Sequence, residues 1–355
     1  MKIAIVGTYP PQKDGIGIYT SRYVEALRDQ GHEVEVFSFK GNENIDNGVV
    51  GCLSRNNPFS YFSTALKIHR FNPDKVLIQY EYVHYNMLWF PKLLCWLKLL
   101  GHKINLMMHT VAPYERGWKA FVFKMVHLSL FLFVDRVFLH TQSAKASLLR
   151  KTWKKPKIEV VPIAIKPVSG GKEASGKAGK NLLSFGFISY DKGTDVLCKA
   201  MKGLPDVKLT ISGSVSPYAM QKQHDYLEGI KGLCSGKKNI NLINRYVSEK
   251  EKDEMFSKAD FFVLPYRFIE QSAVLTEVWG YGKIPICSDV AGFREEIDGK
   301  YGVLFKQGDV ESLRAAIQDI IKDSKKQKEI LSNIEGLIKE RSFSASALKL
   351  IELLS

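Results

Sequence analysis

Residues able to hold a nucleotide are densest between Pro265 and Pro285. A strand pattern ends at the start of this segment, a polar turn follows, and a helical pattern begins near Ser272. Backbone amides at a helix start attract phosphate, which makes four residues candidate contacts: Gln271, Ser272, Ala273 and Val274. Arg267 can pair with phosphate, and the Glu277 carboxylate can accept hydrogen bonds from two ribose hydroxyls. Without a ligand, these two side chains would be ordinary surface charges.

A second candidate anion contact, Lys192, lies directly before a glycine and a new helical pattern. A lysine in that position can hold a diphosphate as a point charge. Gly186, which follows the preceding strand pattern, is assigned to the same candidate site. An exposed loop lysine without a ligand is the alternative interpretation.

Two further candidates lie in the first half of the chain. Gly15 and Gly17 precede a helical pattern that begins near Ile18, where backbone amides can approach an anionic ligand closely. Their spacing differs from the dinucleotide-binding fingerprint, so a plain strand-to-helix turn is the alternative. His109 ends a strand pattern, at the edge where parallel sheets bind ligands. A ligand contact and a structural histidine are equally open for it.

Both halves alternate short apolar strand patterns with helix-length segments, which predicts parallel sheets with helices on both faces. The predicted strands of the first half are Lys2–Val6, Glu33–Phe39, Lys75–Gln79, Ile104–His109, Arg136–His140 and Ile158–Val161. Those of the second half are Asn181–Phe185, Lys208–Ser212, Ile240–Ile243, Phe261–Leu264, Ile284–Cys287 and Gly302–Phe305. Residues 166–180 are rich in glycine, serine and lysine and predict a linker between domains at 1–165 and 181–340.

The composition agrees with two globular domains in a reducing compartment. The chain has 355 residues, more than one typical core accommodates. Its five cysteines are scattered and contain no C-x-x-C pair, which argues against a disulfide framework or a zinc site. The apolar run Lys2–Val6 is too short for a signal peptide and predicts a buried strand.

The positive charge of the chain is concentrated in one region. The net charge is +14, and residues 88–157 hold 13 basic and 2 acidic side chains. Met87–Leu100, which begins one residue before this region, and Trp118–Val134 within it mix tryptophan, phenylalanine and leucine with lysine and are too short to span a bilayer. We expect peripheral docking on an anionic membrane surface. The alternative is a pair of buried helices whose lysines extend outward to solvent.

At this point the sequence resembles glycosyltransferase family 4 over nearly its whole length. In the first half the matching segments are Asp14–Gly17, Gly31–Val34 and the strand-end His109. In the second half they are Asp191–Gly193, Ala259–Pro265, Glu277, Gly282–Pro285, Asp289–Gly292, Gly302–Phe305 and Gly308–Asp309. Each match is modest by itself, and their shared order and spacing make the resemblance specific.

The sequence departs from the family pattern at two places. The family commonly has an arginine after the glycine that aligns with Gly186, and this chain has Phe187. Arg267 or Arg245 is then the candidate partner of Lys192. The family also has two glutamates eight residues apart, whereas Glu270 lies seven before Glu277. The Q-S-A turn at Gln271 is similar to a subgroup that has Q-S-G there.

The resemblance implies the α/β GT-B fold, in which two Rossmann-like, doubly wound domains face a central cleft. It also implies a C-terminal helix within 341–355 that returns to the first domain. The three-residue spacing of Leu348, Ile351 and Leu354 predicts that they form its buried stripe. The implied activity is metal-independent, retaining transfer of a hexose-type sugar. His109, Lys192 and Glu270 would be catalytic, and the other candidates would bind the donor.

The implied donor is a nucleotide-sugar, most simply a UDP- or GDP-sugar, and no cofactor is required. The implied acceptor is a glycan or a lipid-linked sugar in cell-surface polysaccharide or glycolipid synthesis. We expect a cytoplasmic protein, peripheral on the inner face of the cell membrane. A sugar-nucleotide epimerase of the same fold is one alternative. Another is a basic protein that binds nucleic acid or membrane without catalysis, although no recognised nucleic-acid motif occurs. The absence of an Asp-x-Asp motif argues against a GT-A enzyme.

Overall fold

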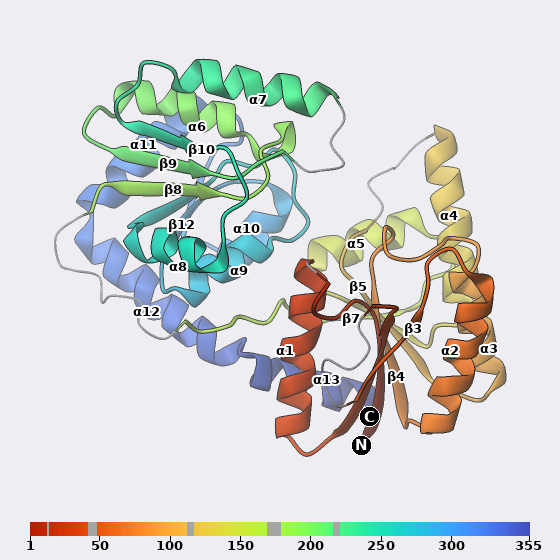
Figure 1. The fold of residues 1–355 in the computed structure, drawn as a ribbon. Coiled ribbons are helices and arrows are strands. Elements are labelled where there is room, and N and C mark those ends of the chain that lie inside the picture. The colour runs from red at the N-terminus through yellow and green to blue at the C-terminus, as the bar shows by residue number, and fades with distance from the viewer. Residues whose placement is uncertain (13, 42–47, 112–116, 169–178, 216–220) are drawn as a thin grey trace. The chain divides into compact units, whose positions relative to one another are not determined.

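The computed structural model describes residues 1–12, 14–41, 48–111, 117–168, 179–215 and 221–355 (Figure 1). The chain forms two compact units. Unit 1 comprises Met1–Ile163 and Phe343–Ser355, and unit 2 comprises Ala164–Ser342. Residues 169–178 of the predicted linker lie outside the described part of the chain.

Unit 1 is built on a seven-stranded sheet with the order β3-β2-β1-β4-β5-β6-β7. All its strand pairs are parallel, and Ile3 of β1 lies between Val34 of β2 and Lys75 of β4. Its strands are β1 Lys2–Val6, β2 Glu33–Phe39, β3 Val49–Leu53, β4 Lys75–Tyr80, β5 Ile104–Met108, β6 Arg136–Leu139 and β7 Lys157–Val160. The edge strand β3 was not predicted from the sequence. Gly51 at its centre weakens the strand pattern there.

The helices of unit 1 connect these strands, except the one at Phe343–Leu354, which follows unit 2 in the sequence. They are α1 Gly15–Asp29, α2 Pro58–Phe71, α3 Phe90–Leu99, α4 Gly117–Phe131, α5 Gln142–Lys151 and α13 Phe343–Leu354. Helix α1 starts where the Asp14 side chain accepts a hydrogen bond of 2.7 Å from the Gly17 amide. After α1, Gly31 has a φ of +79°, a left-handed conformation that favours glycine.

Helix α13 packs against α1, so the first and last helices of the chain lie side by side in unit 1 (Figure 1). The Tyr23 hydroxyl donates a hydrogen bond of 2.8 Å to the Ser346 carbonyl. The buried apolar residues of α13 are Ala347, Leu350 and Leu354. Of the predicted stripe, Leu354 is buried as expected, whereas Leu348 is exposed and Ile351 is half-buried, because a strict spacing of three drifts around a helix of 3.6 residues per turn.

Unit 2 contains a six-stranded parallel sheet with the order β10-β9-β8-β11-β12-β13. Its strands are β8 Asn181–Phe185, β9 Lys208–Ser212, β10 Ile240–Ile243, β11 Phe261–Leu264, β12 Ile284–Ser288 and β13 Val303–Phe305. Two neighbouring residues of β8 belong to different apolar clusters of unit 2. Leu182 lies in the larger cluster and Leu183 lies in the smaller one. Both faces of the sheet are thus covered, as in doubly wound folds.

Helices and two short 3-10 segments, η1 and η2, connect the strands of unit 2, and two more helices follow its last strand, β13. They are η1 Tyr190–Lys192, α6 Thr194–Ala200, η2 Met201–Gly203, α7 Gln221–Cys234, α8 Glu249–Lys258, α9 Ala273–Gly280, α10 Ala291–Ile297, α11 Val310–Lys322 and α12 Ser324–Glu340. Helix α8 begins at a capping box formed by Ser248 and Glu251. The start of α9 is capped by the Ser272 side chain, which accepts a hydrogen bond of 3.3 Å from the Leu275 amide.

No helix in the described ranges is long and apolar enough to cross a bilayer. The same ranges contain no cluster of histidine, cysteine, aspartate and glutamate side chains that could hold a metal ion.

Candidate functional site

The candidate site of unit 2 lies at the carboxyl ends of β8 and β11. From β8 the next strands, β9 and β10, extend the sheet to one side, and from β11 the strands β12 and β13 extend it to the other side. The space between the ends of β8 and β11 is therefore the topological switch point, where doubly wound folds bind ligands. A cavity of about 320 Å³ opens here. Its lining residues are Phe185, Gly186, Phe187, Lys192, Gly213, Ser214, Arg245, Tyr246, Val247, Glu249, Lys252, Tyr266, Val274 and Glu277.

Five residues selected from the sequence line this cavity: Gly186, Lys192, Arg245, Val274 and Glu277. Gly186 has a φ of +119°, which a residue with a side chain rarely adopts. Its carbonyl oxygen would lie 1.8 Å from a Cβ atom added to Gly213. The main chain after β8 and the main chain after β9 therefore come close together at Gly186 and Gly213, which glycine allows, and they form one wall of the cavity.

Lys192 lies at the end of η1, with Nζ 3.7 Å from the ring centroid of Tyr266. Burial lowers the pKa of Lys192 to about 8, although the neighbouring Asp191 carboxylate acts in the opposite direction. The position of the loop depends on Gly193, which has a φ of +65°. A Cβ atom there would lie 1.9 Å from the Pro265 carbonyl oxygen. The half-buried ammonium group can meet an anion inside the cavity.

Arg267 is engaged inside the protein and does not line the cavity. Its guanidinium forms an ion pair of 2.9 Å with Asp195 and donates a hydrogen bond of 2.6 Å to the Tyr190 carbonyl. Arg245 is the arginine that lines the cavity, and it pairs with Glu251 at 2.6 Å. Of the two arginines weighed as partners of Lys192, Arg245 is thus nearer to the ligand space.

Glu277 belongs to α9 and is held by a lysine that sequence reasoning missed. Lys252 Nζ lies 3.2 Å from Glu277 Oε1 and 2.8 Å from Glu249 Oε2. Burial lowers the pKa of Lys252, but the two glutamates together outweigh burial and hold that pKa above its usual value. The ammonium group fixes the Glu277 carboxylate at the cavity wall and leaves its second oxygen able to accept hydrogen bonds. No sequence signal for Lys252 existed apart from its place in the helix before β11.

The turn before α9 contains the remaining unit 2 candidates. Glu270 and Gln271 are half-buried, Ser272 is buried as the helix cap, and Ala273 is exposed. The Glu270 main chain packs against Gly292, where an added Cβ would lie 2.8 Å from the Glu270 carbonyl oxygen. These four side chains do not line the cavity, whereas Val274 does.

The unit 1 candidates lie at the carboxyl ends of β1 and β5. His109 Nε2 is 2.7 Å from Gln79 Oε1. Burial lowers its pKa well below the usual value, and the neighbouring His140 and His84 lower it further, so the His109 imidazole is neutral at pH 7. The amide of Gly17 is already used by the helix cap, as described above. Gly15 is exposed, and a Cβ atom there would meet nothing within 4 Å.

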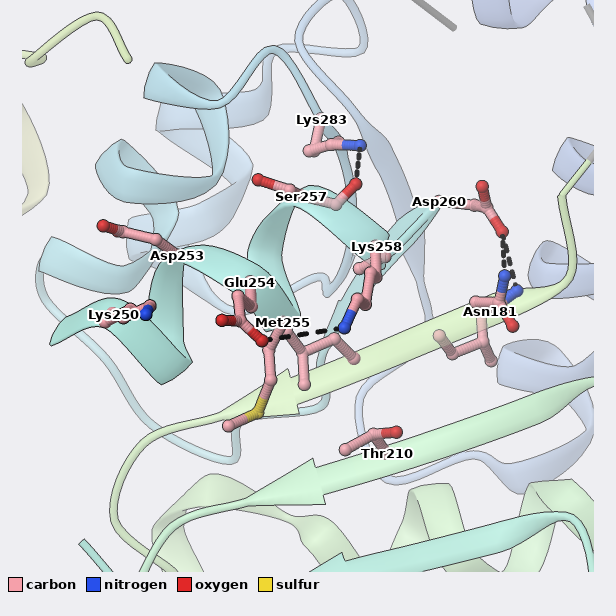
Figure 2. A pocket seen from close by; sticks show the side chains of 13 residues that line it. Asn181, Thr210, Lys250, Asp253, Glu254, Met255, Ser257, Lys258, Asp260 and Lys283 are labelled. Atoms are coloured by element: carbon pink, nitrogen blue, oxygen red, sulfur yellow. Dashed lines mark hydrogen bonds and ion pairs between the residues drawn. The ribbon is translucent and has the colours of Figure 1, made fainter. Parts of the chain in front are cut away.

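A larger cavity of unit 2, about 880 Å³, lies where β8 and β11 begin (Figure 2). Its polar walls interact with one another. Asn181 Nδ2 donates a hydrogen bond of 2.9 Å to Asp260, and Lys283 Nζ donates one of 3.1 Å to the Ser257 carbonyl. None of the candidates from the sequence lines it. Since ligands of such sheets bind at the opposite strand ends, we assign the site to the smaller cavity.

Comparison with known proteins identifies the family. Residues 13–167 match the model described as Glycosyltransferase Family 4, and residues 170–336 match the model described as Glycosyl transferases group 1. The chain belongs to glycosyltransferase family 4. No curated protein sequence matches it.

Solved structures similar to this family-4 chain have the GT-B fold. Sucrose-phosphate synthase from Thermosynechococcus elongatus is 19% identical, with a TM-score of 0.75 over 99% of this chain and 98% of that chain. The Anabaena protein HepE in complex with UDP is 14% identical, with a TM-score of 0.77 over 100% and 99%. An E. coli trehalose-6-phosphate structure bound with UDP-2-fluoro glucose is 14% identical, with a TM-score of 0.75 over 100% and 99%. At these identities the likeness establishes the fold: two Rossmann-like domains of the GT-B type.

Proposed function

We propose that the protein is a retaining glycosyltransferase that moves a hexose-type sugar from a nucleotide-sugar to a glycan or lipid-linked acceptor. The observation that carries the proposal is that Lys192 and Glu277 line one cavity at the switch point of unit 2. A cation and a carboxylate held in one space suit the diphosphate and the ribose of a nucleotide. The Tyr246 and Val247 side chains of the same wall offer apolar surface for the base.

In this proposal the protein stabilises a departing nucleoside diphosphate. The bond from the sugar carbon C1 to the phosphate oxygen breaks, and a bond from C1 to the acceptor oxygen forms on the same face. The acceptor proton passes to the departing phosphate. Negative charge grows on the diphosphate, where Lys192, Arg245 and the amides before α9 stabilise it without a metal ion. His109 and Glu270 carry catalytic roles by resemblance, and a neutral His109 is suited to a hydrogen bond with a sugar hydroxyl.

UDP-glucose is the first donor to test, because HepE binds UDP and UDP-glucose in solved structures and the E. coli structure contains UDP-2-fluoro glucose. The acceptor is proposed to be a glycan or lipid-linked sugar in cell-surface polysaccharide or glycolipid synthesis. The protein would work in the cytoplasm, on the inner face of the cell membrane. The basic region 88–157 supports this placement.

A panel of UDP-, GDP- and ADP-sugars tests the proposal. We expect one nucleotide series to raise the unfolding temperature and to be hydrolysed slowly to the nucleoside diphosphate, with chelator present or absent. The same sugar should stabilise a Glu277→Gln variant much less. Absence of stabilisation by every member would contradict the donor site. Conversion of the donor into its epimer, without net release of nucleoside diphosphate, would favour the epimerase alternative.

A further inference from the structure

Helix α4 of unit 1 is apolar on two opposite faces. One face is buried against the unit and includes Ala120, Val126, Leu130 and Phe131. On the other face, four large apolar side chains have between 45% and 73% of their surface exposed: Trp118, Phe121, Met125 and Leu132, the last directly after the helix end. We call these four residues the α4 stripe. A helix that is apolar all round is normally buried all round, so the exposed face needs an explanation.

The spacing shows that the α4 stripe is one continuous surface. Its members follow one another at intervals of three, four and seven residues, which places them on one side of a helix of 3.6 residues per turn. Trp153, which follows α5, extends the stripe. Its ring centroid is 5.8 Å from that of Phe121, and 52% of its surface is exposed. No described residue of the chain buries this row of side chains.

Basic side chains border the α4 stripe. Lys119 and Lys124 lie on opposite sides of it, at angular positions outside the apolar arc. Lys119 Nζ is 5.9 Å from the Trp118 ring centroid, and Lys124 Nζ is 5.8 Å from that of Trp153. Lys154 and Lys155 are exposed directly after Trp153. An apolar face with tryptophan, bordered by lysines, is the composition of a helix that lies in a membrane interface.

The charge decides between two occupants of this surface. A second copy of the chain would bring two regions of 13 basic and 2 acidic side chains against each other, and this repulsion opposes a symmetric dimer. An anionic lipid surface complements the same charge. We propose that α4 lies in the plane of an anionic phospholipid membrane, with the α4 stripe and Trp153 inserted at the boundary between headgroups and acyl chains. This proposal rests on the proposed function, in which the protein works at a membrane surface, and it adds which residues enter the membrane.

The neighbouring helix α3 differs from α4. It buries Phe90, Leu93, Leu94 and Leu97 in unit 1, and its exposed Lys98 is paired with Asp135 at 2.6 Å. Segment Met87–Leu100 is therefore an ordinary one-sided helix over most of its length. Docking should depend on the inserted side chains of α4 more than on the lysines of α3.

Vesicle co-sedimentation of the full chain tests the proposal. The probes are vesicles of phosphatidylglycerol with phosphatidylcholine, and vesicles of phosphatidylcholine alone. We expect binding to the anionic vesicles and a loss of about tenfold or more in the double variant Phe121→Ser with Met125→Ser. Leu348→Ser is the matched control, since Leu348 is 56% exposed on α13 of the same unit. It should bind as the unchanged protein does.

Three further measurements keep the outcomes distinct. Brominated lipids should quench Trp118 fluorescence in the unchanged protein, and a Trp118→Phe variant identifies that signal. Equal sedimentation of the double variant and the control, or no quenching, would overturn the proposal. A dimer in sedimentation equilibrium that the double variant abolishes would assign the surface to a second copy instead. Donor binding in solution should be unchanged in the double variant, so failure of docking is separable from failure of the proposed function.

Discussion

Replacing Lys192 by methionine should make the protein more stable and much less active. Methionine keeps much of the length of the side chain and removes its charge. Burial lowers the pKa of Lys192 from 10.5 to about 8. At about 1.36 kcal/mol for each pKa unit, keeping this ammonium group in the folded protein costs about 3 kcal/mol at pH 7. The loss of the contact with the Tyr266 ring offsets about 1 kcal/mol of that gain.

The pH dependence gives this prediction its sign. Between about pH 8 and pH 10.5 the unfolded chain holds a proton on Lys192 that the folded protein has lost, so the stability of the unchanged protein rises with pH in this window. The advantage of Lys192→Met, about 2 kcal/mol at pH 7, should therefore shrink as the pH approaches 10.5. Urea denaturation of both proteins at several pH values measures this difference.

The activity of the same variant should change in the opposite direction. Removing a group that stabilises the departing diphosphate should lower kcat/KM by about a hundredfold to a thousandfold. In the unchanged protein, kcat/KM should fall above about pH 8 as Lys192 loses its proton, and the variant should lack this alkaline limb. Donor hydrolysis followed across the pH range is the assay. A variant that keeps the limb, or that is less stable than the unchanged protein at pH 7, would refute the reasoning.

Three other changes probe the described contacts. Glu277→Gln should raise the donor KM by about tenfold with little change in unfolding temperature. Glu249→Gln, which removes the other carboxylate paired with Lys252, should raise the donor KM less. Gly193→Ala should lower the unfolding temperature and the donor affinity, because the added Cβ atom would lie 1.9 Å from a main-chain carbonyl oxygen. Gly236→Ala is the control in thermal melting, because Gly236 has a similar φ of +71° and an added Cβ atom would meet nothing within 4 Å. Tyr23→Phe, which removes the hydrogen bond to α13, should lower the free energy of unfolding by about 1 kcal/mol in urea titration.

The order of elements was predictable because burial on both faces leaves a local signal in parallel strands. Continuous apolar runs such as Phe261–Leu264 are short, and turn residues bound them. Strand β3 lacked this signal, since it lies at the sheet edge and contains a glycine. The sequence also could not predict which apolar face of α4 is exposed. Apolar residues occur all around this helix, and only its packing in unit 1 distinguishes the buried face from the exposed one.

The site was predictable where a residue lies in the turn between a strand end and the next helix, as Gly186 and Lys192 do. The interaction partner of each charged side chain was not predictable, because these partners lie far away in the sequence. Arg267 was selected as a phosphate ligand, and its contact with Asp195 spans 72 positions. Lys252 was missed for the same reason, since only the fold brings it to Glu277.

The return of α13 to α1 means that unit 1 is encoded in two separated pieces. During translation, the sequence up to Ile163 emerges first, yet the face of α1 that α13 covers stays exposed until residues Phe343–Leu354 have left the ribosome. Unit 2 is continuous in the sequence and is available in full before that moment. A premature stop just after unit 2 would thus damage the unit whose synthesis began first. Unit 1 is therefore complete only when the sequence through Leu354 has been made.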